Sequence, residues 1–312
     1  MNKIKFFNKK IEYFFKILRT IFISDHKFVS KKFKEKFHCE PNLLIPATLN
    51  EKIIHRMLND DNIDFKIFAN KIFAHKYVTR HIGEKYVVPM LGIYKNFNDI
   101  DFTLLPNKFV LKCNHDSGSA IVCKDKCNFD IAAARNRISF HMSRDMYYIT
   151  RERHYRSIEP MIICEKFINS ESDEQLNMGN AKINMLRLHC FDGQIGFIEA
   201  DISEYSKSYT NVYDRNWAFI DVRVGAPNLE LHLPQPTNFE DVAMKSMKLT
   251  KQFDYCRLDW HITDSGFYFS EFTFTPCAGR IEFSPKHFDS QFGSLWHKID
   301  RHVSCKKITS NA

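Results

Sequence analysis

The 312-residue sequence has no uncharged run of the roughly 18 residues that a helix needs to cross a bilayer. It also shows no secretory signal peptide, because Lys9, Lys10 and Glu12 interrupt the early apolar stretch and no small-residue cleavage site follows. The nine cysteines are scattered singly, and the closest pair, Cys123 and Cys127, has no second pair at zinc-ligand spacing. We therefore expect a cytoplasmic protein with reduced thiols.

Most of the chain carries no net positive charge. The formal net charge is +8, but residues 1–36 hold eleven Lys and Arg against three acids, so the remainder carries 34 charges of each sign. A nucleic-acid-binding body would need a basic face there, so we expect no nucleic-acid partner. Within the basic segment, apolar residues recur at helical spacing from Phe7 to Phe22, which predicts an amphipathic helix. Two interpretations stay open: peripheral membrane contact through residues 3–22, or packing on the chain's own domain.

The pattern beyond this segment mixes helices with β-hairpins. We expect helices near residues 50–58, 64–82, 129–156 and 238–253. Strands are expected at residues 86–94, 109–113, 120–123, 160–168, 255–261 and 267–273, with a hairpin over 183–201 that turns at Asp192-Gly193. Residues 202–237 are expected to be irregular. This order predicts an α+β fold with antiparallel sheets.

One candidate site lies on the last predicted hairpin. Arg257 and Asp259 are two residues apart on one strand, so both side chains point to the same face. Glu271 and Thr273 are likewise two apart on the next strand. If Asp259 faces Glu271, the pair offers the hard oxygen ligands that Mg²⁺ prefers, beside a cation suited to phosphate. The plainer alternative is a strand pair with a salt bridge between Arg257 and an acid.

A second candidate site follows the strand that ends near Lys112. The polar loop 114–119 comes directly after it, and Gly118 permits close approach of the backbone to a phosphate. The loop is not a Walker sequence, which would need Gly-Lys-Ser/Thr at the start of a helix. The predicted strand containing Glu165 runs into an acidic loop, where a nucleotide base and ribose can be held.

These pieces, in this order, resemble the ATP-grasp superfamily and, more closely, the TupA-like ATP-grasp proteins of bacterial surface-polysaccharide clusters. The resemblance runs from Asn50 to about Gly293, and its most specific stretches are 105–115, 155–165, 190–193, 213–217 and 257–276. It implies an ATP-grasp fold, with two α+β subdomains whose antiparallel sheets clasp ATP. The expected divisions are a basic helical segment 1–45, an N-terminal region 46–107, a nucleotide-clamping subdomain 108–180, a metal and catalytic subdomain 181–300 and a tail 301–312.

Carried over by position, the resemblance implies roles for individual residues. Arg257 would stabilise the acyl-phosphate transition state, and Gly279 would help to place the carboxylate. The Mg²⁺ ligands would be Asp259, Glu271 and Thr273. The nucleotide contacts would be Lys71, Lys112, Ser117, Gly118, Ser119, Arg187, the adenine hinge Glu165, Lys166, Phe167 and Ile168, and Glu171 or Asp173 at the ribose.

The sequence departs from the family pattern at a few positions. Thr273 stands where most ATP-grasp enzymes have Asn as a third metal ligand. Asn70 and Arg187 occupy positions where Asp and Lys are usual. Asp116 lies in the phosphate loop at a position where Gly is common, and a carboxylate there is unfavourable beside phosphates unless it points away.

The implied activity is an ATP- and Mg²⁺-dependent carboxylate–amine ligase. Its partners would be an amino acid and a uronic acid of a glycan or of a nucleotide-sugar precursor. Two other functions are compatible with the sequence: a glycosyltransferase that uses Asp99 and Asp101, and a non-catalytic glycan-binding protein that uses Tyr213 and Trp217. Serine hydrolysis through residues 115–117 is disfavoured, because three consecutive side chains do not readily converge as a triad.

Overall fold

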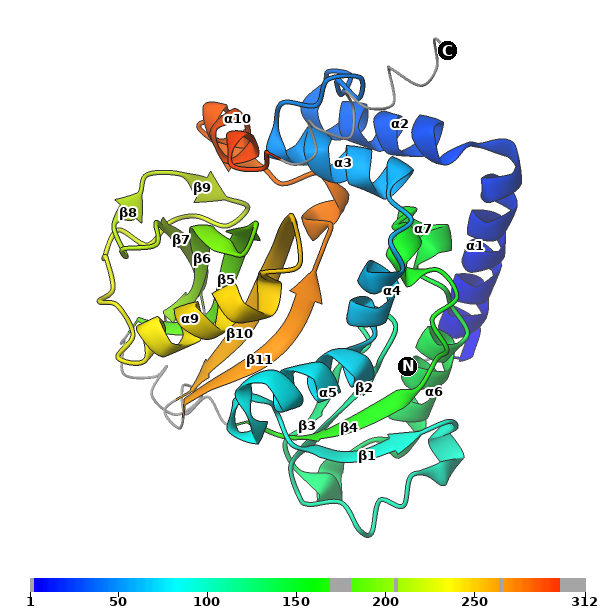
Figure 1. Ribbon diagram of the computed structural model, residues 1–312. Coiled ribbons are helices and arrows are strands. Elements are labelled where there is room, and N and C mark those ends of the chain that lie inside the picture. Colours follow the sequence, from blue (N-terminus) through cyan, green and yellow to red (C-terminus); the bar gives the residue numbers. More distant parts are fainter. Residues whose placement is uncertain (1–2, 169–180, 205–206, 264–265, 298–312) are drawn as a thin grey trace. The chain divides into compact units, whose positions relative to one another are not determined.

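The computed structural model describes residues 3–168, 181–204, 207–263 and 266–297, with side chains from residue 8 onward (Figure 1). The chain forms two compact units, each built from separate segments. Unit 1 comprises Met1–Val29, Asp61–Tyr77 and Val88–Ile168, and unit 2 comprises Ser30–Asp60, Val78–Val87 and Asn169–Ala312. Each unit contains helices and an antiparallel sheet, so the predicted α+β class is confirmed.

The sheet of unit 1 has four strands in the order β1-β4-β2-β3. Its strands are β1 (Met90–Tyr94), β2 (Phe109–Cys113), β3 (Ile121–Cys123) and β4 (Ile162–Lys166). Helix α6 (Ile131–Met142) covers one face, and its buried side chains pack with Leu111 of β2 and Cys164 of β4 in one apolar core. Because strand residues alternate between faces, Lys112 and Glu165 point to the opposite side of this sheet.

Helices complete unit 1. They are α1 (Lys3–Phe22), α4 (Ile63–Ala69) and α7 (Tyr147–Thr150), with the first parts of α2 (Asp25–Phe37) and α5 (Lys71–Ile82). The helical stretch predicted for 64–82 is thus two helices, separated at Asn70, whose extended backbone ends α4. Buried Arg151 follows α7 and donates to the Asp25 carboxylate at 2.8 Å, which ties α7 to the start of α2.

The larger sheet of unit 2 has six strands in the order β11-β10-β5-β6-β7-β8. Its strands are β5 (Lys182–Phe191), β6 (Gln194–Glu204), β7 (Lys207–Tyr213), β8 (Phe219–Ile220), β10 (Tyr255–Thr263) and β11 (Gly266–Thr273). Helix α9 (Phe239–Thr250) packs on β5, β6 and β10, where the Trp260 indole donates to the Ser246 hydroxyl at 2.9 Å. This places Leu258 and Trp260 under α9 and Arg257 and Asp259 on the other face.

The expectation of an irregular stretch over 202–237 was wrong. Strand β6 extends to Glu204, β7 pairs with it, and β8 and β9 (Arg223–Val224) follow. Strand β7 was missed because polar residues occupy half-buried and buried positions, which removes the alternation of apolar and polar residues. Asn211, for example, is fully buried and donates to the Leu229 carbonyl at 3.2 Å.

Helix α3 (Leu49–Asn59) is fixed within unit 2 by buried cations, of which Arg56 makes contacts to several segments. A capping box of Thr48 and Glu51 starts this helix, close to the predicted start. Arg56, only 3% exposed, donates to the Asp254 carboxylate at 2.5 Å and to the Tyr255 carbonyl at 2.8 Å. Its guanidinium also lies 4.2 Å from the ring centroid of Trp296, near α10 (His287–Ser294). Arg56 therefore joins α3, β10 and the segment after α10.

Replacing Arg56 should destabilise the protein strongly. The change Arg56→Ala removes the charged partner of Asp254 and a donor to the Tyr255 and Phe274 carbonyls, so we expect a loss of about 3 kcal/mol in the free energy of unfolding, measured by urea denaturation. The matched control is Arg215→Ala, which removes a similar two-point ion pair to Glu240 at the surface. It should cost much less. Equal losses in the two variants would contradict the role given to Arg56.

Candidate functional site

The predicted hairpin of unit 2 is formed, and it brings four predicted residues together. Arg257 donates from Nε and Nη2 to both oxygens of Asp259, at 2.8 and 2.7 Å. Asp259 pairs in register with Glu271, and Arg257 with Thr273. The predicted facing of Asp259 and Glu271 is thus confirmed, and the alternative, a salt bridge between Arg257 and an acid, is present too. The two features share one face of the sheet.

A β-bulge lies beside this pair. The register of β10 and β11 shifts between Asp259 and Trp260, which leaves Ser270 as the extra residue on β11. A bulge bends the strand and increases its local twist, and bulges often lie where a strand must re-aim a side chain. Nothing in the alternation of residues 266–273 predicts this shift.

Further charged residues extend the face across the neighbouring strands. Arg187 on β5 donates to the Asp201 carboxylate at 2.6 Å and lies 3.9 Å from Asp259. His189 Nε2 lies 3.0 Å from the Glu199 carboxylate, and its Nδ1 lies 3.0 Å from the Tyr255 hydroxyl. We call the set Arg187, His189, Glu199, Asp201, Arg257, Asp259 and Glu271 the polar face.

His189, Glu199 and Asp201 were not predicted as members of the site. The sequence does carry a signal, since a two-residue turn at Asp192-Gly193 places β6 opposite β5 and so brings acids near Arg187. The observed pairing is Arg187 with Glu199, shifted by a bulge between His189 and Cys190. A simple count along the hairpin misses that shift.

The polar face carries more negative than positive charge. Two guanidinium groups meet four carboxylates, which leaves a net charge of −2 when all six are ionised. Burial raises the pKa of Asp259 to about 6, although the Arg257 guanidinium acts to lower it. Burial also raises the pKa of Asp201. The face therefore favours an added cation, which would hold these carboxylates in their charged form.

Glu199 behaves differently from its neighbours. Burial acts to raise its pKa, but the hydrogen bond with His189 and the charges of Arg257 and Arg187 outweigh burial and lower the pKa to about 2. Burial lowers the pKa of His189, so this imidazole is neutral at pH 7. Its Nε2–H then donates to Glu199, and its Nδ1 accepts from the Tyr255 hydroxyl.

The donor set fits Mg²⁺ held together with phosphate. Within the part of the chain that the structure describes, no group of three or more His, Cys, Asp or Glu side chains is arranged to hold a metal ion. The carboxylates of Asp259 and Glu271 form a pair instead, with the Thr273 hydroxyl 3.3 Å from Glu271. Mg²⁺ is commonly bound by one or two carboxylates plus nucleotide phosphates, so a pair of hard oxygen ligands suits it.

Gly279 lies in the loop that follows β11. Its backbone is left-handed, with φ of 68°. A Cβ there would lie 2.5 Å from Ile54 Cγ1 and 2.9 Å from the Asn50 carbonyl oxygen of α3. Only glycine therefore allows this loop to approach α3 so closely.

In unit 1, Lys112 lies in an ion pair on the sheet face opposite α6. Its Nζ is 2.7 Å from Glu165 Oε2, and the two side chains are 18% and 10% exposed. Lys166 pairs with Phe109 at the end of β4, and its amide donates to the Pro89 carbonyl at 2.9 Å. The predicted hinge 165–168 therefore begins inside a strand that is paired on both sides. Glu171 and Asp173 lie outside the described residues.

Lys71 holds the first half of the loop 114–119. Lys71 Nζ donates to the Asp116 carbonyl at 2.5 Å, and the Lys71 amide donates to the Asn114 carbonyl at 3.0 Å. Ser117 and Gly118 are exposed at the tip, and Gly118 has φ of 83°. Lys71 and Lys112 thus belong to the same unit as this loop, and their predicted contacts with ATP phosphates stay a prediction.

The Asp116 carboxylate points away from the exposed tip. It is 2% exposed, accepts from the Ser119 hydroxyl at 2.6 Å and pairs with His141 of α6. Ser119 in turn accepts from the Cys113 amide at 2.8 Å, so its hydroxyl braces the loop from inside. Asp116 therefore stabilises the loop from its buried side, and its carboxylate adds no negative charge to the exposed tip.

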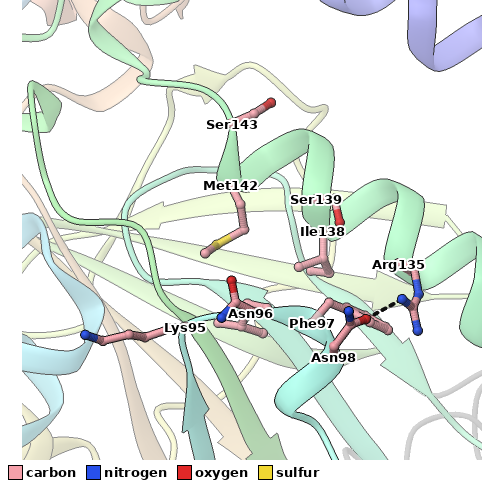
Figure 2. A pocket seen from close by; sticks show the side chains of 10 residues that line it. Lys95, Asn96, Phe97, Asn98, Arg135, Ile138, Ser139, Met142 and Ser143 are labelled. Carbon is pink, nitrogen blue, oxygen red and sulfur yellow. Dashed lines mark hydrogen bonds between the residues drawn. The ribbon is translucent and has the colours of Figure 1, made fainter.

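A separate hollow of about 470 Å³ lies beside α6. Figure 2 shows Ile138 and Met142 reaching from α6 toward Phe97 and Asn96, with Arg135 bonded to Asn98. Ile162 also lines the hollow and belongs to the apolar core under α6. The hollow is thus on the opposite face of the sheet from Lys112 and is no part of the predicted nucleotide contacts.

The buried histidine of the polar face should make stability depend on pH. Because the pKa of His189 is lowered below its usual 6.5, the unfolded chain takes up a proton as pH falls through about 6.5 while the folded chain does not. Folding stability should therefore decrease toward acid, with His189 contributing up to about 1.4 kcal/mol per pH unit. Urea unfolding of His189→Gln between about pH 5 and pH 7 should give a shallower dependence than that of the unsubstituted protein. An unchanged slope would contradict a buried neutral His189.

Comparison with known structures finds distant likenesses. D-alanine–D-alanine ligase from Bacillus anthracis is 18% identical, with 79% of this chain and 70% of that chain covered and a TM-score of 0.43. The ATP-grasp ligase PsnB in complex with its minimal precursor is 11% identical, with 70% and 54% covered and a TM-score of 0.39. Identities and TM-scores this low carry no conclusion about substrates. No curated protein matches the chain.

A family model gives the assignment. The model described as TupA-like ATP-grasp matches residues 51–297, which include Lys71, Lys112, the loop 114–119 and the whole polar face. The match also covers every strand of the four-stranded and the six-stranded sheet. The chain therefore belongs to the TupA-like ATP-grasp family and is an ATP-grasp carboxylate–amine ligase.

Proposed function

We propose that this ligase uses ATP and Mg²⁺ to join an amino acid, or a related amine, to the carboxyl group of a uronic acid. The uronic acid would belong to a bacterial capsule or O-antigen polysaccharide, or to its nucleotide-sugar precursor. The observation that carries the proposal is the polar face, where Arg257 is locked to Asp259 and Glu271 lies opposite in register. A buried cation beside paired carboxylates suits a reaction in which phosphate charge develops.

The chemistry has two steps. A carboxylate oxygen of the uronic acid attacks the γ-phosphorus of ATP, the bond to the bridging oxygen breaks, and ADP leaves. The amine nitrogen then attacks the acyl carbon, phosphate departs with the carbon–oxygen bond, and the nitrogen loses a proton to give the amide. Mg²⁺ supplies charge neutralisation on the phosphates during transfer.

The residues of unit 2 serve the charged groups of this reaction. Arg257 is held in place because Nε and Nη2 both donate to Asp259. Burial acts to lower the pKa of the guanidinium, but the charge and hydrogen bonds of Asp259 outweigh burial and raise the pKa further above its normal range. Such a preorganised cation stabilises developing oxyanion charge without reorganising. Asp259 and Glu271 would hold the metal, with Thr273 as a weaker oxygen donor. Gly279 would shape the loop that places the substrate carboxylate.

The residues of unit 1 would contact the nucleotide. Lys71 and Lys112 offer two cations, and the exposed tip Ser117-Gly118 offers backbone N–H groups. Since ATP is a cytoplasmic substrate, we propose a cytoplasmic site of action, peripheral on the inner face of the membrane. Asp99 and Asp101, the acids of the glycosyltransferase alternative, accept local hydrogen bonds from Asn96 and Thr103. They act as loop caps, which leaves the ligase as the better proposal.

An ADP-release assay with a panel of uronic acids and amino acids tests the proposed function. We expect ADP release that requires ATP, Mg²⁺ and both acceptors. The variants Lys112→Ala and Glu271→Gln should each lower the rate by at least about 100-fold, because each removes charge stabilisation from phosphoryl transfer.

Matched surface variants serve as controls for this assay. Lys16→Ala removes a lysine that makes a 2.6 Å ion pair with Glu12, and Glu240→Gln removes an acid paired with Arg215. Both should keep the rate of the unsubstituted protein. If the rate of ADP release is unchanged in both Lys112→Ala and Glu271→Gln, the roles proposed for these residues are wrong. Sugar transfer from a nucleotide donor without ATP would favour the glycosyltransferase.

A further inference from the structure

Helix α1 is packed on unit 1 through its polar side. The Tyr13 hydroxyl donates to the Asp145 carbonyl at 3.4 Å and accepts from the Asp145 amide at 2.8 Å, just before α7. Arg19 donates to the Tyr148 carbonyl at 3.3 Å. The Lys9 ammonium lies 5.6 Å from the ring centroid of Phe140 on α6. In Figure 1, α1 runs alongside α7 and α6.

The apolar side of α1 is therefore left outward. Residues 11, 14, 15, 18 and 22 recur at intervals of three and four and form one stripe. Within that stripe Phe14 is 56% exposed, Phe15 62% and Phe22 82%, and nearby Ile21 is 71% exposed. An amphipathic helix on a soluble domain normally buries its apolar stripe and exposes its polar side. Here the orientation is reversed, so the interpretation of α1 as a helix that simply packs on its own domain does not account for the exposed stripe.

Charge identifies what covers this stripe. The segment of unit 1 that contains α1, residues 1–29, carries a net charge of +5, from seven Lys and Arg and two acids, and Lys10 is exposed beside the stripe. Two copies of the chain joined through α1 would bring two such segments together, and like charges repel. An anionic lipid surface instead attracts the lysines and accepts the phenylalanines at the boundary of headgroups and acyl chains. Among the described residues, no helix is long and apolar enough to cross a bilayer.

We infer that the outward stripe of α1 docks the chain on an anionic lipid bilayer, with Phe14, Phe15 and Phe22 inserted at the interface. Helix α1 precedes the region that matches the ligase family, residues 51–297. The inference therefore goes beyond the ligase chemistry and rests on the contacts and exposure of α1. Docking would hold the ligase at the membrane surface.

Vesicle sedimentation with the full chain tests the docking. The protein should bind phosphatidylglycerol vesicles, bind phosphatidylcholine vesicles much more weakly, and lose most binding when salt rises from about 0.1 M to about 0.5 M. The double variant Phe15→Ser/Phe22→Ser should bind phosphatidylglycerol at least about tenfold more weakly, because two large apolar side chains no longer leave water.

The control is matched by exposure and lies in the same unit. Ile63 is 62% exposed and Leu104 is 82% exposed, the same values as Phe15 and Phe22. The variant Ile63→Ser/Leu104→Ser should bind vesicles like the unsubstituted protein. Absence of vesicle binding by the unsubstituted protein, or equal losses in the two double variants, would overturn the inference.

Light scattering, which measures the oligomeric state, tests whether a second copy of the chain covers the stripe instead. If the unsubstituted protein is a dimer that Phe15→Ser/Phe22→Ser converts to a monomer, and no vesicle binding is seen, the stripe is covered by a second copy and the inference is overturned. ADP release measured on the same preparations keeps the two proposals apart. Normal vesicle binding without ATP turnover would reject the proposed ligase substrates and leave the docking intact.

Discussion

The buried ion pair between Arg257 and Asp259 is the interaction on which the candidate site depends. Removing two charges from water is costly, and the cost is met here because both Asp259 oxygens accept from one guanidinium. The pair then fixes where charge lies on the sheet. Arg187 lies 3.9 Å from Asp259, and Glu271 faces Asp259 in register. A structural feature of the sheet thereby becomes a place suited to a metal and phosphates.

In unit 1, too, polar partners compensate a buried charge. Its phosphate loop contains an acid, but the Asp116 carboxylate is turned inward onto Ser119 and His141. The brace gives the loop a defined shape without glycine at this position, and the tip at Ser117 and Gly118 stays exposed. A residue that looks unfavourable beside phosphates is thus compatible with binding them.

Much of this could be predicted from the sequence, since regular alternation and short turns determine strand faces and pairs. The facing of Asp259 and Glu271 follows from such a pattern. Features set by tertiary contacts could not be predicted: the polar strand β7, the bulge at Ser270 and the direction of the Asp116 side chain. The helical pattern of α1 predicted a helix but not which side packs. The divisions expected at residues 45, 107, 180 and 300, and the roles of the individual site residues, stay predictions.

Trapping of the activated carboxylate tests the central claim most directly. With hydroxylamine in place of the amine, the protein with ATP, Mg²⁺ and a uronic acid should form the corresponding hydroxamate, in step with ADP. That product requires an acyl phosphate, and Arg257→Ala should abolish it, because the guanidinium that would stabilise its transition state is gone. Formation of ADP without hydroxamate across a panel of uronic acids, or undiminished hydroxamate from Arg257→Ala, would contradict the account.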